Sequence, residues 1–155
     1  MRRLDVASYA SRDVGLLLLR LGIGISMLAF HGYAKLTSGP ERWRGIGGTM
    51  EGLGISFLPV FWGFMAAFAE SICSALLVLG FLFRPAAAIL ACTMLVAASH
   101  HLRIPAGEPG SGWGAASHAI ELFAVYVALF LTGPGKYALG LLGGSGAERP
   151  LARRG

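Results

Sequence analysis

The sequence predicts an all-α protein: an antiparallel four-helix transmembrane bundle with a short interfacial amphipathic helix between helices 1 and 2. Composition is the first observation behind this prediction, because the 155 residues are 55% hydrophobic and only 14% charged. A soluble domain carries about 25% charged residues, so this chain has too few charges to cover a water-facing surface. The second observation is the succession of four apolar segments along the chain. We therefore expect a lipid bilayer as its solvent and a single domain over residues 1–155.

Each apolar segment is long enough to cross a bilayer. In chain order they cover residues 14–36, 59–83, 85–102 and 116–132. A spanning helix needs roughly 17–25 apolar residues, and a backbone in lipid must satisfy its own hydrogen bonds, which requires helices here. Proline marks the segment edges, since Pro59 and Pro85 begin two segments and Pro134 follows the last. Such positions suit a first helical turn or a helix stop.

The connection between the first two segments predicts an additional short helix. Within residues 41–53, apolar side chains recur at roughly helical spacing, with charged residues between them. This pattern is typical of an amphipathic helix at a membrane interface. Three glycines in the same stretch weaken helix formation, so an irregular loop is the alternative.

The distribution of basic residues predicts the orientation. One side carries Arg2, Arg3, Arg12, Arg84, Lys136, Arg149, Arg153 and Arg154, and the other carries Lys35, Arg42, Arg44 and Arg103. Because the side richer in Lys and Arg stays in the cytoplasm, both termini should be cytoplasmic in a bacterial inner membrane. The charges sit at segment ends and not along one soluble face, so we expect no nucleic-acid partner.

A small set of ionisable residues lies inside the apolar segments: Arg20, His31, Glu70, His100, His101, His118 and Glu121. Each costs at least ~2.5–3.5 kcal/mol to insert, so each is a candidate functional residue. Counting along the helices puts Glu70 near mid-membrane and Arg20 in the cytoplasmic half. The histidines and Glu121 fall in the periplasmic half, where they predict a polar layer.

Helical periodicity indicates which of these residues share a face. Arg20, His31 and Lys35 form one stripe of the first helix, and His118 and Glu121 lie three residues apart on the fourth. If these faces turn inward, they form a polar pocket that is open toward the periplasm. A quinone headgroup would find hydrogen-bond donors and a proton relay there.

The quinone interpretation assigns roles to particular residues. His31, Glu70, His118 and Glu121 are the candidate catalytic residues, lining the headgroup and the proton path. Arg20, His31, Lys35 and His100 are the candidate cofactor-binding residues, with Arg20 as the counter-ion.

Two other interpretations of the polar residues remain open. Imidazoles and carboxylates can hold a metal ion, but the His118–Glu121 spacing is common by chance, so no metal ligand is assigned. Alternatively the groups are structural, with Arg20 paired to Glu70 and His118 to Glu121 to fix the order of the helices.

Several short patterns resemble the DoxX family of small bacterial membrane proteins. In the first helix these are Arg20 and the run His31-Gly32-Tyr33-Ala34-Lys35, and in the second they are Glu70, Leu79-Gly80 and Arg84. Glu121 and the closing run from Thr132 to Tyr137 complete the likeness, which reaches from Leu16 to about Leu139. The family often ends in a Ser and an Asp where this chain has Ala138 and Gly140, which puts a role for that pair in doubt.

The resemblance implies a four-helix membrane protein, in one branch similar to a subunit of thiosulfate:quinone oxidoreductase. Together with the clustering of the ionisable groups in one layer, this makes a membrane subunit of a quinone-linked oxidoreductase our leading hypothesis. The sequence has no haem, iron–sulfur or dinucleotide motif, so a partner protein or the quinone would carry the electrons. The rival hypothesis is a non-catalytic scaffold or receptor for proteins or small solutes. The substrate, the partner and self-association of the chain are left open.

Overall fold

The computed structural model describes the backbone of residues 2–139 and the side chains of residues 11–139. Within this part of the chain, four helices are long and apolar enough to cross a membrane, namely Ser11–Leu36, Pro59–Leu79, Phe83–Arg103 and Gly112–Thr132. The predicted all-α, four-helix fold class is thereby confirmed. The orientation prediction rests partly on side chains outside these ranges, those of Arg2, Arg3, Arg149, Arg153 and Arg154.

The first two spans are each interrupted by one π-helical turn. The first span is α1 (Arg2–Met27), a π turn η1 (Leu28–Gly32) and α2 (Tyr33–Leu36); the second is α4 (Pro59–Phe68), a π turn η3 (Ala69–Cys73) and α5 (Ser74–Leu79). Between them lie α3 (Pro40–Gly48) and a 3-10 turn η2 (Thr49–Leu53), and the last spans are α6 (Phe83–Arg103) and α7 (Gly112–Thr132). Sequence periodicity gave no sign of the π turns.

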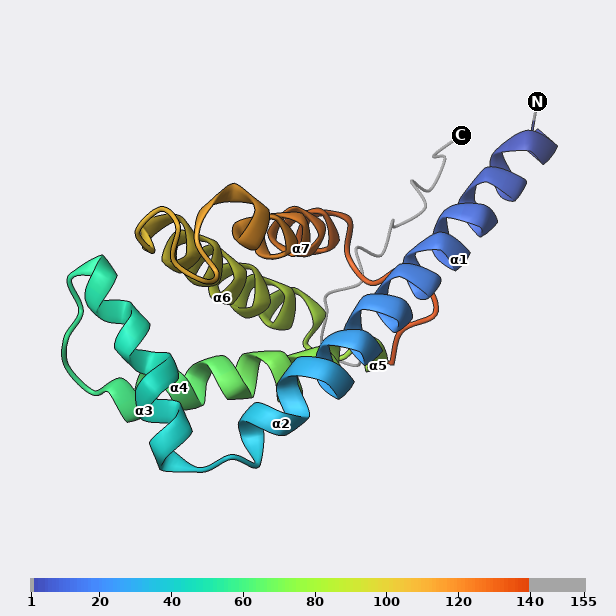
Figure 1. The fold of residues 1–155 in the computed structure, drawn as a ribbon. Helices are drawn as coiled ribbons and strands as arrows, with labels where there is room; N and C mark the ends of the chain where they lie inside the picture. The colour runs from blue at the N-terminus through green and yellow to red at the C-terminus, as the bar shows by residue number, and fades with distance from the viewer. Residues whose placement is uncertain (1, 140–155) are drawn as a thin grey trace, which may run out of the picture.

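Successive spans run in opposite directions. We call the end at which α5 and α7 finish and α6 begins the terminal side, and the opposite end the α3 side. In Figure 1, α6 and α7 lie alongside each other, α3 folds back against α4, and α1 crosses close to α5. Large side chains such as Leu18, Phe30 and Leu131 point outward and are 64%, 79% and 69% exposed. Such a surface is expected where a protein faces lipid. The surrounding hydrocarbon is itself apolar, so apolar side chains can remain on the outside of the protein.

The second span ends earlier than predicted, at Leu79 and not at residue 83. Gly80 adopts a left-handed conformation with φ of +70°, which closes a helix and favours glycine. A side chain at Gly80 would also collide with Arg20, because an added Cβ would lie 2.7 Å from the guanidinium Nη1. α6 then begins at Phe83, two residues before the predicted start, and α7 begins at Gly112, four before its predicted start.

The predicted helix between the first two spans is present as α3 and the turn η2. Two glycines hold α3 directly against α4. An added Cβ at Gly47 would strike the Pro59 carbonyl, and one at Gly63 would strike the Trp43 backbone. Small residues at a helix contact allow the two backbones to approach closely. This contact fixes α3 as one wall of a cavity.

Candidate functional site

A cavity of about 560 Å³ lies between α3, α4 and α6. Its walls are mostly apolar, and its lining includes Ile46 and Met50 from α3 and η2, Met65 from α4, and Ile89 and Val96 from α6. Drug-sized ligands occupy clefts of about 300–1,000 Å³ that have apolar walls and a few convergent polar groups. The cavity therefore has the size and character of a site for an apolar molecule with a polar end.

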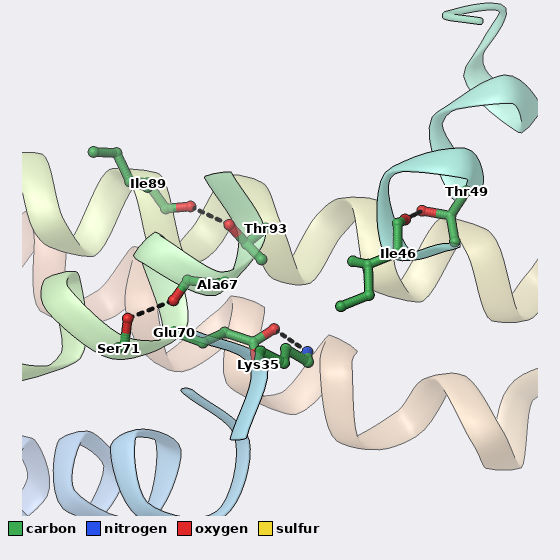
Figure 2. Close-up of polar contacts among 8 residues, drawn as sticks. All are labelled: Lys35, Ile46, Thr49, Ala67, Glu70, Ser71, Ile89 and Thr93. Carbon is green, nitrogen blue, oxygen red and sulfur yellow. Dashed lines mark hydrogen bonds and ion pairs between the residues drawn. The ribbon is translucent and has the colours of Figure 1, made fainter. Parts of the chain in front are cut away.

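A part-buried ion pair provides the polar end of this cavity. Lys35 Nζ donates to both carboxylate oxygens of Glu70, at 2.6 and 2.7 Å, as Figure 2 shows. The Glu70 side chain is 5% exposed and that of Lys35 is 24% exposed. Charge-assisted hydrogen bonds of this length are among the stronger polar contacts in proteins. Both residues line the cavity, so a bound molecule would meet a charged donor beside a carboxylate.

Local structure brings the two partners of the ion pair together. Glu70 lies in the π turn η3, and Gly32 ends the π turn η1, which contacts η3. An added Cβ at Gly32 would strike the Glu70 carbonyl, so glycine allows α2 to approach closely enough for Lys35 to reach the carboxylate. π turns of this kind are frequent at functional sites.

The chain after Lys35 is also held in place. The Lys35 carbonyl accepts hydrogen bonds from Trp43 Nε1 and Ser38 Oγ, both at 2.8 Å. The indole of α3 thereby ties α3 to the end of α2, at a carbonyl that also accepts from the Ser38 backbone N–H. Trp43 therefore helps to position the segment that carries Lys35.

The α6 wall carries polar atoms along one face. Thr93 Oγ1 donates to the Ile89 carbonyl at 2.9 Å, within its own helix (Figure 2), which leaves the hydroxyl oxygen able to accept. His100 and His101 line the cavity near the α3 side. Cys92 also lines it and is exposed, whereas Cys73 is buried. One native thiol therefore reports on the cavity and the other on the core.

The predicted periplasmic layer of polar residues is divided in the structure. Lys35, Glu70 and His100 line the cavity described above, whereas His31 and His118 line a second, smaller cavity of about 250 Å³ between α1 and α7. The two imidazole rings are stacked there with centroids 5.8 Å apart. Glu121 is exposed and lines neither of these cavities. The roles assigned to these residues from sequence stay predictions.

Arg20 does not serve as the counter-ion of Glu70, which corrects the pairing expected from sequence. The residue is only 2% exposed, and its Nη1 donates to the Pro134 carbonyl at 2.8 Å. The reason is the position of the two residues along the bundle. Arg20 lies near Gly80, where α5 ends, whereas Glu70 lies in the π turn that precedes α5, closer to the α3 side. Lys35, which the sequence had placed only among the cofactor contacts, takes the role of counter-ion.

Among the described residues, no three His, Cys, Asp or Glu side chains lie close enough together to hold a metal ion. The His118–Glu121 pairing suggested by their spacing is likewise not formed within this part of the chain. Sequence reasoning missed the contribution of α3 to the cavity wall, whereas the face of α6 shared by Thr93 and His100 could be read from helical spacing. The helical spacing of Ile46 and Met50 was visible, but only the folded chain shows which neighbour that face meets.

Comparison with known proteins identifies the family. The sequence model of the DoxX family matches residues 15–102, more than half of the chain. The chain belongs to the DoxX family. Searches of curated proteins and of solved structures found no match. The match to DoxX covers the cavity, including Lys35, Glu70 and His100, and it stops before α7, which carries His118 and Glu121. DoxX membership and four apolar spans together make this a multi-pass membrane protein in a lipid bilayer.

Proposed function

We propose that this DoxX protein binds a quinone in the cavity between α3, α4 and α6 and acts as the membrane component of a quinone-linked oxidoreductase. The observation that carries the proposal is the Lys35–Glu70 pair, whose carboxylate is buried at one end of a largely apolar cavity. A quinone combines an apolar tail with a ring that accepts hydrogen bonds through its carbonyls. The cavity supplies a matching apolar wall and a matching donor.

The chain's own groups have separable tasks in this proposal. Lys35 Nζ donates to a ring carbonyl while it remains close to Glu70, and the Thr93 hydroxyl or the His100 ring is available on the opposite wall. Glu70 accepts or returns a proton at its carboxylate, because a quinone gains protons as well as electrons when it is reduced. The apolar side chains of α3 and α6 exclude water and so strengthen these contacts.

Membership in a family of membrane proteins supports the remaining parts of the proposal. The chain lies in the bacterial inner membrane with the terminal side facing the cytoplasm, as the excess of Lys and Arg on that side predicts. The sequence holds no redox-centre motif, so electrons pass between the quinone and a partner protein. A receptor for apolar solutes would use the same cavity without the redox step, and the test must separate the two.

The two native cysteines allow a binding assay by thiol labelling, so no new cysteine has to be introduced. In purified protein, a short-chain ubiquinone analogue should slow maleimide labelling of Cys92 in a saturable manner, while buried Cys73 reports that the fold is intact. Replacing both partners, as Lys35→Met with Glu70→Gln, should weaken binding about 10- to 100-fold, because a charge-assisted hydrogen bond contributes about 1.5–3 kcal/mol.

Two controls make this assay decisive. An alkyl compound with the same tail and no quinone ring should protect Cys92 much less, and equal protection would favour the receptor hypothesis. The variant Glu108→Gln lies in the exposed loop between α6 and α7, outside the cavity, and should bind normally. Absence of saturable protection, or loss of binding in Glu108→Gln but not in the double variant, would refute the proposed site.

A further inference from the structure

Three buried polar atoms have no hydrogen-bond partner among the described residues: Arg20 Nε, Ser74 Oγ and Tyr126 Oη. The residues that carry them are 2%, 0% and 0% exposed. Buried polar groups in folded proteins are nearly always hydrogen-bonded, to protein or to internal water, and each exception requires an explanation. The three atoms come from three different spans, so the contacts between those spans decide how the atoms are arranged.

Ser74 and Arg20 are linked through the contact of α1 with α5. Ser74 lies one helical turn after Glu70 along the second span. It faces α1 at Gly24, where an added Cβ would lie 3.2 Å from the Ser74 carbonyl. Arg20 lies one turn before Gly24 on α1, in the direction of the terminal side. The order toward that side is therefore Glu70, Ser74 and then Arg20.

Tyr126, on the fourth span, lies in the same part of the core as Ser74. It belongs to the buried core together with Cys73 and Leu77, which flank Ser74 on the second span. The fourth span therefore packs against the part of the second span that carries Ser74. Glu70, one turn earlier on the second span, is bound from the first span by Lys35.

At the terminal side, this series of polar residues meets the segment after α7, which two hydrogen bonds attach to α1. Arg20 Nη1 donates to the Pro134 carbonyl. Asp13 Oδ1, two turns earlier on α1, accepts from the Lys136 backbone N–H at 3.3 Å. A guanidinium cannot release its proton in a protein, so Arg20 can position other groups but cannot itself relay a proton. Asp13 is half-buried at the same segment and offers a carboxylate at the end of this series.

We propose that Ser74 and Tyr126, joined by internal water and positioned by Arg20, form a polar track that carries protons between Glu70 and the terminal side. A proton from water near Asp13 passes along hydroxyl and water hydrogen bonds and protonates the Glu70 carboxylate; release reverses the path. The inference deepens the proposed function, on which it rests, because Glu70 is then the link between the quinone cavity and water on the opposite side. It gives a role to Ser74 and Tyr126, which the sequence did not single out.

The rate at which Glu70 becomes protonated tests the track. In vesicles with the terminal side outward, the outer medium is acidified rapidly, and the carboxyl infrared band that Glu70→Gln abolishes is followed with time. Ser74→Ala and Tyr126→Phe should each slow this band by about tenfold or more, since a positioned proton-transfer group contributes about 10²–10⁴-fold. The control Ser71→Ala removes a buried hydroxyl that is already bonded to the Ala67 carbonyl, and it should leave the rate unchanged.

Stability and binding measured on the same variants separate the outcomes. If the Tyr126 hydroxyl were simply unpaired, Tyr126→Phe would raise the melting temperature; that result, or an unchanged protonation rate, would overturn the track. Protection of Cys92 by the quinone analogue should persist in both track variants. If protection is absent even in the unaltered protein while Ser74→Ala still slows protonation, the quinone proposal fails and the track stands.

Discussion

At the scale of single residues, the Lys35–Glu70 pair sets the character of the site. Removing two charges from water costs several kcal/mol per ion, and their attraction offsets this only when the geometry is good. Here the carboxylate receives both short hydrogen bonds from one ammonium group. Such a pair is a weak source of stability, which agrees with our proposal that a bound ligand requires it.

The stability of single and double variants tests this view of the pair. Lys35→Met should destabilise the protein by about 2–4 kcal/mol, because it leaves the Glu70 charge buried without a partner. Lys35→Met combined with Glu70→Gln should regain most of that loss, since no charge then remains at the site. Thermal unfolding in detergent would measure both. A double variant as unstable as the single one would show that the pair holds the fold together and would remove this reason to expect a ligand.

At the scale of secondary-structure elements, glycines decide how closely the helices approach. Gly47 and Gly63 place the backbones of α3 and α4 in contact, and Gly32 does the same for the two π turns. Each contact positions part of the cavity: the first positions its α3 wall and the second its ion pair. Amphipathic spacing predicted that α3 is a helix, but the surface that it covers depends on these small residues.

Glycine-to-alanine variants test the role of the α3–α4 contact. Gly63→Ala should destabilise the protein by about 1–3 kcal/mol, because the new methyl group meets the Trp43 backbone and the helices must separate. Gly45→Ala is the matched control, since Gly45 lies in α3 and has open space around it. That control should be neutral or stabilise by about 0.5–1 kcal/mol through helix propensity.

Thermal unfolding and Cys92 labelling would report the two effects of Gly63→Ala together. Movement of α3 should also open the cavity and accelerate labelling of Cys92, which Gly45→Ala should leave unchanged. Equal stability of the two variants would show that the α3–α4 contact adapts without loss, and that α3 is not a fixed wall.

At the scale of the whole molecule, the antiparallel order of the spans would give the two sides of the protein different tasks in the proposed function. The cavity proposed for quinone extends from Glu70 toward the α3 side, where His100 and His101 lie. The proposed polar track extends from Glu70 toward the terminal side, where Arg20 meets Pro134. Glu70 lies between them, so electron chemistry at the cavity and proton exchange at the opposite side would share one carboxylate.

Labelling from one side of the membrane tests the orientation. In a Cys92→Ser background, a membrane-impermeant maleimide added to intact cells should label Glu108→Cys, an exposed residue on the α3 side. Lys136→Cys, exposed on the terminal side, should be labelled only after the cells are broken. The reverse pattern would place the terminal side outside the cytoplasm and reverse the direction of the proposed proton transfer.

Some of this protein was determined by sequence alone. Hydropathy, segment length and proline placement predicted the all-α fold and the spans, because a backbone in lipid has no alternative to internal hydrogen bonding. The motifs at Arg20, at His31 to Lys35 and at Glu70 predicted the family. These are local properties, and each can be recognised within one segment without knowing its neighbours.

Only the tertiary structure decided which polar groups meet. Lys35 and Glu70 are 35 residues apart in the chain, and nothing in either helix indicated that Glu70 would pair with Lys35 and not with Arg20. The π turns and the glycine contacts set the rotation and separation of the helices, which the regular period of about 3.6 residues per turn cannot predict. Ionisable residues can be found in a sequence because insertion is costly, but their partners depend on how the helices pack.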